Sequence, residues 1–350
     1  MVKKCAIVLA GGKAERFQVK DSPWIDKALA NVIGKPLLIH VIERVKPVVE
    51  EIIICVNNET RRRKYMRVLR NFLIKNDYVK IVKDFKIPSI SGPAVAIATG
   101  LSVSNADHCI IVPCDTPFIQ PAVVDYLFNA IGDASIAVPI HADGSAETLM
   151  FTCERGKIAE ISETLCWLGR DRPDDLLRGS PKVKFISTKR LKNLDPEFKS
   201  FININFQKDL AELRTRVTLN GPIKRNVCIN LGAPKSFELK MLKKAAEKYL
   251  HNKFIEAVKV FSSLSNFFEE RRLYFWAGLC WEKEGSAIQT LIKNRRDMET
   301  KSEWREKSKQ AFRKAVQNYA LEAEIFTRKQ IYLLAKRAKE DELWCKHLSS

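Results

Sequence analysis

Short apolar runs alternate with amphipathic stretches along the first two hundred residues. The runs predict strands at residues 4–9, 52–56, 79–82, 108–112 and 135–139. The amphipathic stretches predict helices at residues 37–45, 61–74, 94–102 and 123–130. This alternation predicts an α/β fold with a doubly wound, mostly parallel sheet. Ligands of such sheets bind beyond the carboxyl ends of the strands. We therefore expect Gly11, Asn57, Asp84 and Asp115, which follow strands, on one edge of the sheet.

The pattern changes near residue 236, where glycine becomes scarce and Lys, Glu, Ala and aromatic residues recur with helical spacing. Gly221-Pro222 and Gly232-Ala233-Pro234 precede this change and are typical of a connecting segment. We therefore expect a first domain over residues 1–222, a linker over 223–235 and an all-α domain over 236–350.

The helical part contains a weak internal repeat. Ala245 and Gly278 lie about 33 positions apart, close to the tetratricopeptide period. The pattern is interrupted between Ser286 and Glu303. A plain helical bundle with an aromatic core explains the same spacing equally well. A domain of either kind can offer a surface to a protein partner.

The chain is strongly basic, with 60 Lys and Arg against 41 Asp and Glu and a net charge of +19. Such a charge favours anionic substrates. The densest cluster, Arg61-Arg62-Arg63-Lys64 with Arg67 and Arg70, fits one solvated helix face better than an RNA-binding patch. Because the sequence shows no aromatic-rich RNA motif, we do not expect nucleic acid as a partner.

The sequence predicts a cytoplasmic protein without a membrane segment. No apolar run is long enough to span a bilayer, and the apolar stretch at 6–10 is too short for a secretion signal. The nine cysteines are scattered without a Cys-x-x-Cys pair. This pattern indicates free thiols in a reducing compartment, most of them in the core.

The first strand runs directly into Gly11-Gly12, a pattern that suits a phosphate cradle. The glycines allow a tight turn whose N–H groups face an anion. Arg16 and Lys27 follow and can reach the same oxygens. The loop has neither the Gly-Lys-Ser/Thr of a Walker loop nor the dinucleotide fingerprint. By itself, a double glycine is also compatible with an ordinary structural turn.

Asp115 is the sharpest single candidate for chemistry. It follows the apolar strand at 108–112, and Pro113 and Pro117 stiffen the turn that presents it. A carboxylate opposite a phosphate cradle suggests Mg²⁺, which prefers carboxylate oxygens together with substrate phosphates. An Asx-turn or a helix N-cap is the structural alternative. The combination with the cradle favours the metal.

A series of motifs carries a resemblance to a known family. The series begins with Leu9-Ala10-Gly11-Gly12, Arg16, Asp26-Lys27-Ala28-Leu29 and Gly34-Lys35-Pro36-Leu37. It continues with Val56-Asn57, Asp84, Gly92-Pro93, Pro113-Cys114-Asp115-Thr116-Pro117-Phe118 and Phe201-Ile202-Asn203-Ile204-Asn205. In order and spacing, residues 3–210 resemble the molybdenum cofactor guanylyltransferase family of nucleotidyltransferases. The resemblance implies the Rossmann-type fold of nucleotide-diphospho-sugar transferases.

The resemblance also implies roles for individual residues. It implies that the nucleotide, GTP, is bound by Leu9, Ala10, Gly11, Gly12, Lys27, Asn57, Asp84 and Asp115. Arg16, Lys27 and Asp115 are implied as the catalytic residues, and Asp115 with Asn205 as the site of Mg²⁺. The implied reaction transfers GMP from GTP to the molybdenum-molybdopterin cofactor and releases pyrophosphate.

Two departures from the family pattern leave alternatives open. Residues 17–25 form an insertion between Arg16 and Asp26, and Phe206 follows Asn205 where the family continues differently. Cytidylyl transfer is one alternative, and transfer to another phosphate acceptor, such as cobinamide phosphate or a sugar phosphate, is a second. A nucleotide-binding scaffold whose helical domain docks partners is the alternative outside the enzymes.

Overall fold

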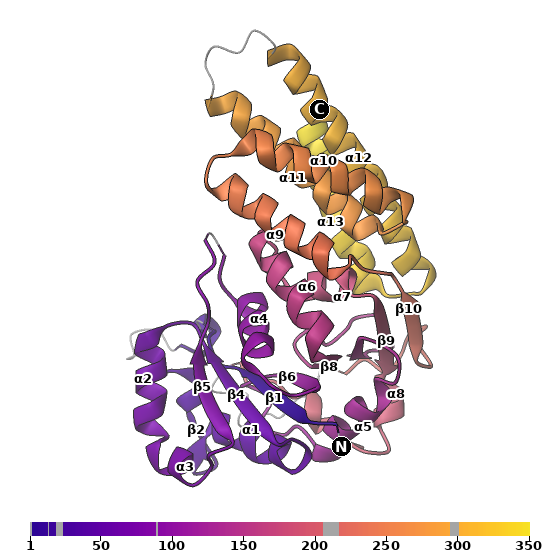
Figure 1. The fold of residues 1–350 in the computed structure, drawn as a ribbon. Coiled ribbons are helices and arrows are strands. Elements are labelled where there is room, and N and C mark those ends of the chain that lie inside the picture. The colour runs from indigo at the N-terminus through magenta and orange to yellow at the C-terminus, as the bar shows by residue number, and fades with distance from the viewer. Residues whose placement is uncertain (1, 13, 19–23, 89, 206–216, 295–300) are drawn as a thin grey trace. The chain divides into compact units, whose positions relative to one another are not determined.

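The computed structural model describes residues 2–12, 14–18, 24–88, 90–205, 217–294 and 301–350. Within these residues the chain divides into two compact units (Figure 1). The first unit comprises residues up to 163, residues 171–173 and residues 182–229. The second comprises residues 164–170, 174–181 and 230–350.

The first unit is built on one mixed sheet with the strand order β10-β9-β7-β8-β6-β1-β4-β5. Its strands are β1 (Lys4–Leu9), β4 (Glu51–Val56), β5 (Val79–Lys83), β6 (His108–Pro113), β7 (Ile136–Ile140), β8 (Phe151–Glu154), β9 (Lys182–Ser187) and β10 (Val227–Asn230). β1 pairs in parallel with β4 and β6, β4 with β5, and β7 with β9. β8 runs antiparallel to both β6 and β7. The predicted α/β fold with a mostly parallel sheet is confirmed.

The central strands are apolar on both faces because helices cover both sides of the sheet. Cys5, Ala6, Ile7 and Val8 of β1 have no exposed surface, and neither has any residue at 52–56 of β4. Fully buried parallel strands of this kind lack the polar alternation of a half-exposed strand. The five strands predicted from apolar runs are therefore found within one residue of their expected ends.

The helices of this part of the chain are α1 (Leu37–Val45), α2 (Glu59–Val68), α3 (Arg70–Ile74), α4 (Pro93–Val103), α5 (Pro121–Ala130), α6 (Arg155–Trp167), α7 (Pro173–Gly179) and α8 (Thr188–Leu191). Short 3₁₀ turns cover η1 (Glu15–Phe17), η2 (Lys27–Leu29), η3 (Lys46–Val48) and η4 (Lys199–Phe201), and β2 (Asn31–Val32) pairs with β3 (Lys35–Pro36). The single helix predicted at 61–74 is wrong, because Leu69 leaves helical geometry at φ −96° and ψ 11° and divides it into α2 and α3.

The parallel strands bring the candidate residues together at one edge of the sheet. Gly11 follows β1, Asn57 follows β4, Asp84 follows β5 and Asp115 follows β6. Because β6 and β7 both run antiparallel to β8, the carboxyl end of β7 lies on the same edge. The predicted common edge is confirmed, since these four residues line one pocket.

The second unit consists mainly of α9 (Ser236–Leu250), α10 (Phe254–Glu270), α11 (Tyr274–Asn294), α12 (Lys301–Arg328) and α13 (Tyr332–Ser349), each packed on the next. Where a repeat interruption was expected after Ser286, α11 continues to Asn294 and α12 begins at Lys301. The ring of Tyr319 lies 2.9 Å from the position that a Cβ of Gly278 would occupy, so this glycine allows α11 and α12 to pack closely.

Three connections between these helices use the same turn. Asn252, Arg272 and Gln330 have left-handed φ values of 62°, 57° and 63°. The following residue donates its N–H to a carbonyl five positions back, as in Leu273 to Phe268 at 2.9 Å and Ile331 to Phe326 at 2.9 Å. This is the Schellman pattern, which satisfies carbonyls at the ends of α9, α10 and α12.

The structure also bears on the predicted linker, the cysteines and membrane-spanning segments. The segment predicted as a linker, 223–235, contains β10, and the boundaries 1–222 and 236–350 stay predictions. All nine cysteines are free and seven are buried, as expected. Across the described residues, no helix combines the length and the apolar character needed to cross a membrane.

Candidate active site

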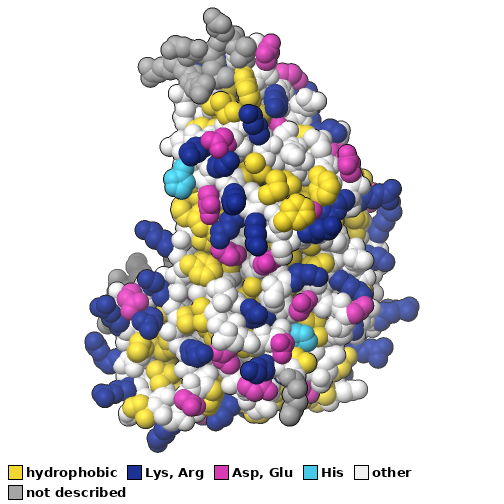
Figure 2. Space-filling model, viewed as in Figure 1, with side chains coloured by type: hydrophobic (Ala, Val, Ile, Leu, Met, Phe, Trp, Pro, Cys, Tyr) yellow, Lys and Arg dark blue, Asp and Glu magenta, His cyan; other side chains and the backbone are white. Residues whose placement is uncertain are grey.

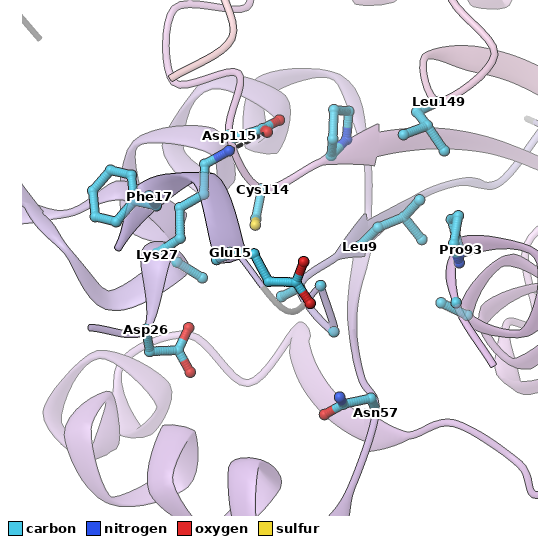
Figure 3. A pocket seen from close by; sticks show the side chains of 18 of the residues that line it. Leu9, Glu15, Phe17, Asp26, Lys27, Asn57, Pro93, Cys114, Asp115 and Leu149 are labelled. Atoms are coloured by element: carbon cyan, nitrogen blue, oxygen red, sulfur yellow. Dashed lines mark hydrogen bonds and ion pairs between the residues drawn. The ribbon is translucent and has the colours of Figure 1, made fainter. Parts of the chain in front are cut away.

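A pocket of about 460 Å³ opens at the carboxyl edge of the sheet in the first unit (Figure 3). Its lining residues come from the ends of β1, β4, β5 and β6, from η1 and η2, and from the start of α4. All the predicted nucleotide-binding residues line it, together with Asn205: Leu9, Ala10, Gly11, Gly12, Lys27, Asn57, Asp84 and Asp115. The structure therefore brings these residues together, and their individual roles stay predictions.

The Gly11-Gly12 loop lies tightly against the neighbouring strand ends. The Ala10 N–H donates to the Cys55 carbonyl at 2.9 Å, and the Cys114 N–H donates to the Leu9 carbonyl at 3.1 Å. A Cβ at Gly11 would lie 3.0 Å from the backbone nitrogen of Asn57, which is closer than ordinary van der Waals contact. Glycine therefore lets the loop approach β4 at this distance without a shift of its neighbour.

Lys27 links two sides of the pocket. Its Nζ lies 2.6 Å from Oδ2 of Asp115 and donates to Oδ1 of Asn205 at 3.1 Å. Figure 3 shows the ammonium group pointing at the Asp115 carboxylate. The Ile204 N–H donates to the Asp115 carbonyl at 2.9 Å, which fixes the segment before Asn205 against the end of β6.

The donor set around Lys27 suits a small hard cation. A carboxylate oxygen and an amide oxygen converge on one ammonium nitrogen, so this position already holds a positive charge. Mg²⁺ takes one or two protein oxygens and completes its shell with phosphate oxygens and water. Among the described residues there is no group of three or more Asp, Glu, His or Cys that could hold a metal without such help. Asp115 and Asn205 therefore fit a metal that arrives with a nucleotide.

Asp84 is a largely buried acid beside the glycine loop. Its Oδ2 lies 3.5 Å from the position of a Gly11 Cβ, and its Oδ1 has no hydrogen-bond partner among the described residues. Burial raises the pKa of Asp84 from 3.8 to about 7, an effect that the charge of Arg61 opposes. An unpartnered buried carboxylate oxygen is costly unless a ligand supplies a donor.

Arg61 is a site residue that the sequence interpretation missed. Its side chain is only 9% exposed, and its Nη1 donates to the Gly12 carbonyl at 3.1 Å and to Oδ1 of Asn57 at 3.3 Å. Its Nε lies 3.1 Å from Oδ2 of Asp26. Arg61 is therefore not part of the solvated helix face that the sequence predicts. Other members of the cluster are exposed, and Figure 2 shows basic side chains over this region: Arg63, Lys64, Arg67 and Arg70.

A usable signal for Arg61 was present in the sequence. Tyr65 lies one helical turn later on the same face of α2, and its side chain is fully buried. The Tyr65 hydroxyl donates to Oδ1 of Asp26 at 2.8 Å and to the Ala10 carbonyl at 3.3 Å. An arginine four positions before a core tyrosine points toward the same interior.

The wall opposite Lys27 is apolar. Leu9, Pro93 and Leu149 lie across the pocket from the Lys27–Asp115 pair in Figure 3. This combination of a charged end and an apolar wall suits a molecule with phosphates at one end and a flat ring at the other. Cys114 also lines the pocket, but burial raises the pKa of its thiol to about 12, so it stays protonated and is a poor nucleophile.

Some predicted features lie outside the residues that the structure describes. Arg16 lies in η1, but its side chain is outside the described part of the structure, as are residues 19–23 of the insertion and Phe206. At the ends of the insertion, Phe17 is buried and lines the pocket, and Trp24 is 51% exposed. The predicted contribution of Arg16 to phosphate binding stays a prediction.

The glycine loop, the Lys27–Asp115 pair and the other residues that line the pocket, apart from Asn205, lie within the part of the chain that matches a known family. The model of the MobA-like NTP transferase domain matches residues 6–183, more than half of the chain. The chain belongs to this family. The resemblance inferred from the motifs is thereby confirmed, and so is the assignment to the nucleotidyltransferases.

Two curated relatives illustrate the match. A probable molybdenum cofactor guanylyltransferase of Methanosarcina mazei is 27% identical over 210 residues, covering 60% of this chain and 89% of the relative. A protein of the same description from Pyrococcus horikoshii is 29% identical over 214 residues, covering 60% of this chain and 98% of the relative. The crystal structure of molybdopterin-guanine dinucleotide biosynthesis protein A from Archaeoglobus fulgidus aligns over 60% of this chain and 96% of its own, with 22% identity and a TM-score of 0.48.

Proposed function

We propose that this protein transfers GMP from GTP to a molybdopterin-type phosphate acceptor and releases pyrophosphate. The observation that carries the proposal is the convergence of Lys27, Asp115 and Asn205 at one end of a pocket floored by the Gly11-Gly12 loop. Membership of the MobA-like family supports nucleotidyl transfer, and the descriptions of the two relatives support guanylyl transfer and this acceptor.

The chain's own residues bind and orient the nucleotide. The glycine loop presents backbone N–H groups to the phosphates. The unpartnered Oδ1 of Asp84 accepts a hydrogen bond from an N–H or O–H of the nucleoside, and the apolar wall at Leu9, Pro93 and Leu149 receives the base. These contacts place the α-phosphorus near the Lys27–Asp115 end.

The reaction needs positioning and charge neutralisation. A phosphate oxygen of the acceptor attacks the α-phosphorus in line, a new P–O bond forms, and the bond to the β-phosphate oxygen breaks. Because the attacking phosphate is already ionised near neutral pH, no general base is required. Lys27 and Arg16 neutralise the leaving pyrophosphate. Asp115 and Asn205 would hold Mg²⁺, which would supply further charge neutralisation at the phosphate oxygens.

We place this reaction in the cytoplasm, where the nine thiols stay reduced. Docking of a protein partner on the helical unit stays a prediction.

The test is pyrophosphate release from GTP, CTP, ATP and UTP with Mg²⁺, each with and without the molybdopterin acceptor. We expect release from GTP that depends on the acceptor, and its loss in Asp115→Asn with the fold retained. Asp125→Asn is the control, since Asp125 is a half-exposed carboxylate on α5 that pairs with Lys4 outside the pocket. Release from CTP assigns the cytidylyl alternative, and release only with cobinamide phosphate or a sugar phosphate assigns another acceptor. Nucleotide binding without release from any pair contradicts the enzyme and favours the scaffold.

A further inference from the structure

Arg61 joins three separate segments of the nucleotide pocket. Its guanidinium contacts Gly12 in the loop after β1, Asn57 at the end of β4 and Asp26 immediately before η2. Gly12, Asn57 and Asp26 all line the pocket, whereas Arg61 itself does not. Arg61 therefore lies behind the pocket wall and touches no ligand directly.

Burial distinguishes this arginine from its neighbours on α2. Arg61 is 9% exposed and Arg63 is 77% exposed. Arg63 pairs only with Glu59 at 3.5 Å, one turn earlier on the helix surface. A buried guanidinium is retained only where acceptors surround it, and here the acceptors belong to the pocket.

Asp26, which pairs with Arg61, directly precedes Lys27 in the chain. Asp26 is 6% exposed. Its Oδ1 accepts from the Tyr65 hydroxyl at 2.8 Å, and its Oδ2 forms an ion pair with the Arg61 Nε at 3.1 Å without the geometry of a hydrogen bond. Without Arg61, the buried Asp26 carboxylate keeps only its neutral partner Tyr65, and the segment that carries Lys27 keeps one contact to α2 in place of two. The Gly12 carbonyl and the Asn57 amide lose a donor at the same time.

We propose that Arg61 is a positioning residue that fixes the glycine loop, Asn57 and the Lys27 segment in the geometry that binds a nucleoside triphosphate. The proposal rests on the nucleotide-binding part of the proposed function. It assigns to Arg61 a role in nucleotide affinity that is separate from acceptor binding, because its contacts lie on the β1–β4 side of the pocket.

Asp84 provides a readout that a purely structural arginine would not change. Among the described residues, the charge of Arg61 on α2 acts on the pKa of Asp84, and Asp84 in turn raises the pKa of Cys55 on β4. Gly11 from the loop after β1 packs beside Asp84. The positive charge of Arg61 holds down the pKa of Asp84 against the effect of burial. Its removal moves the ionisation of Asp84, and the nucleotide binding that depends on it, to higher pH.

The experiment compares Arg61→Met, Arg61→Lys and the matched control Arg63→Met. Binding of GTP, CTP, ATP and UTP is measured by titration calorimetry across neutral pH, and KM is measured for GTP and for the acceptor. Loss of a charged hydrogen-bonding group predicts binding weakened about 10- to 100-fold in Arg61→Met. In Arg61→Met we expect the pH midpoint of nucleotide binding to rise and the KM for the acceptor to stay unchanged. Arg61→Lys should recover part of the nucleotide affinity.

The proposal is overturned if Arg61→Met keeps the nucleotide affinity and pH midpoint of the unmodified protein. A loss that affects the acceptor KM equally also overturns it, since that result describes general destabilisation. If Arg61→Met does not fold, Arg61→Lys decides by the nucleotide affinity and the acceptor KM, since lysine keeps the positive charge that acts on Asp84. An unmodified protein that binds none of the four triphosphates contradicts this inference and the proposed function together. Binding without transfer contradicts the proposed function only.

Discussion

Replacement of Asp84 by asparagine should stabilise the nucleotide-free protein, and more so as the pH rises. Asp84 is buried with one unpartnered oxygen, and its pKa is raised from 3.8 to about 7. The folded state therefore binds this proton more tightly than the unfolded state does. Between these two pKa values the folded protein holds more protons, so the free energy of unfolding falls as the pH rises. Above about pH 7 the loss is complete and constant.

The magnitude follows from the two pKa values. Each pKa unit corresponds to about 1.4 kcal/mol, so an ionised Asp84 costs the folded state about 4 kcal/mol at alkaline pH. At about pH 5, Asp84 is protonated in the folded protein and mostly ionised in the unfolded chain, and the cost is about 2 kcal/mol. The advantage of Asp84→Asn should therefore grow by about 2–3 kcal/mol between about pH 5 and about pH 8.

The assay is urea unfolding with pulse proteolysis, followed on peptides from β4 and β5 so that it reports on the first unit. Asp133→Asn is the control, since Asp133 is an exposed carboxylate that pairs with Lys182 at the surface. A difference between Asp84→Asn and the unmodified protein that stays constant with pH refutes the reasoning. We also expect Asp84→Asn to bind GTP more weakly, because the amide carries no negative charge to accept the nucleoside donor.

Two further predictions concern packing and buried charge. Gly11→Ala should lower the free energy of unfolding by about 1–2 kcal/mol in urea without nucleotide, because its Cβ meets Asn57 at 3.0 Å. Gly12→Ala should leave the free energy of unfolding unchanged, because its Cβ meets nothing within 4 Å. Equal stabilities of the Gly11→Ala and Gly12→Ala variants would show that the loop relaxes freely. Glu322→Gln should destabilise the second unit by about 3 kcal/mol, since both carboxylate oxygens bind the buried Arg178 guanidinium at 2.7 Å. The exposed Glu324→Gln on the same helix should cost less than about 1 kcal/mol, and a similar cost for both changes would contradict the ranking.

The sequence predicted β1, β4, β5, β6 and β7 because these strands are short apolar runs that end in polar residues. It did not predict β10, β8 or the parallel strand β9. Thr152 of β8 lies opposite Ile110 of β6 and Ala137 of β7, in antiparallel register with both. A short apolar strand satisfies either direction equally well, so its pairing depends on the connections around it.

The candidate site could likewise be predicted only in part from the sequence. Its residues could be placed from strand ends and motifs, but the pairing of Lys27 with Asp115 and Asn205 depends on side-chain rotamers and on the path of residues 201–205. Arg61 was assigned to solvent because charged residues on helices are usually exposed. Its burial depends on acceptors that come from three distant segments, and the local pattern gives only the helix face that Arg61 shares with Tyr65.

The second unit also includes residues that the family model matches. Residues 164–170 and 174–181 belong to this unit, and the match extends to residue 183. Arg170 contacts Glu282 of α11 at 2.6 Å and Asp341 of α13 at 2.9 Å, and Arg178 contacts Glu322 of α12 at 2.7 Å. A chain cut before α9 would leave both arginines without these carboxylates. Because an unpaired buried guanidinium is strongly destabilising, the helices from α9 onward are part of what stabilises residues 164–170 and 174–181.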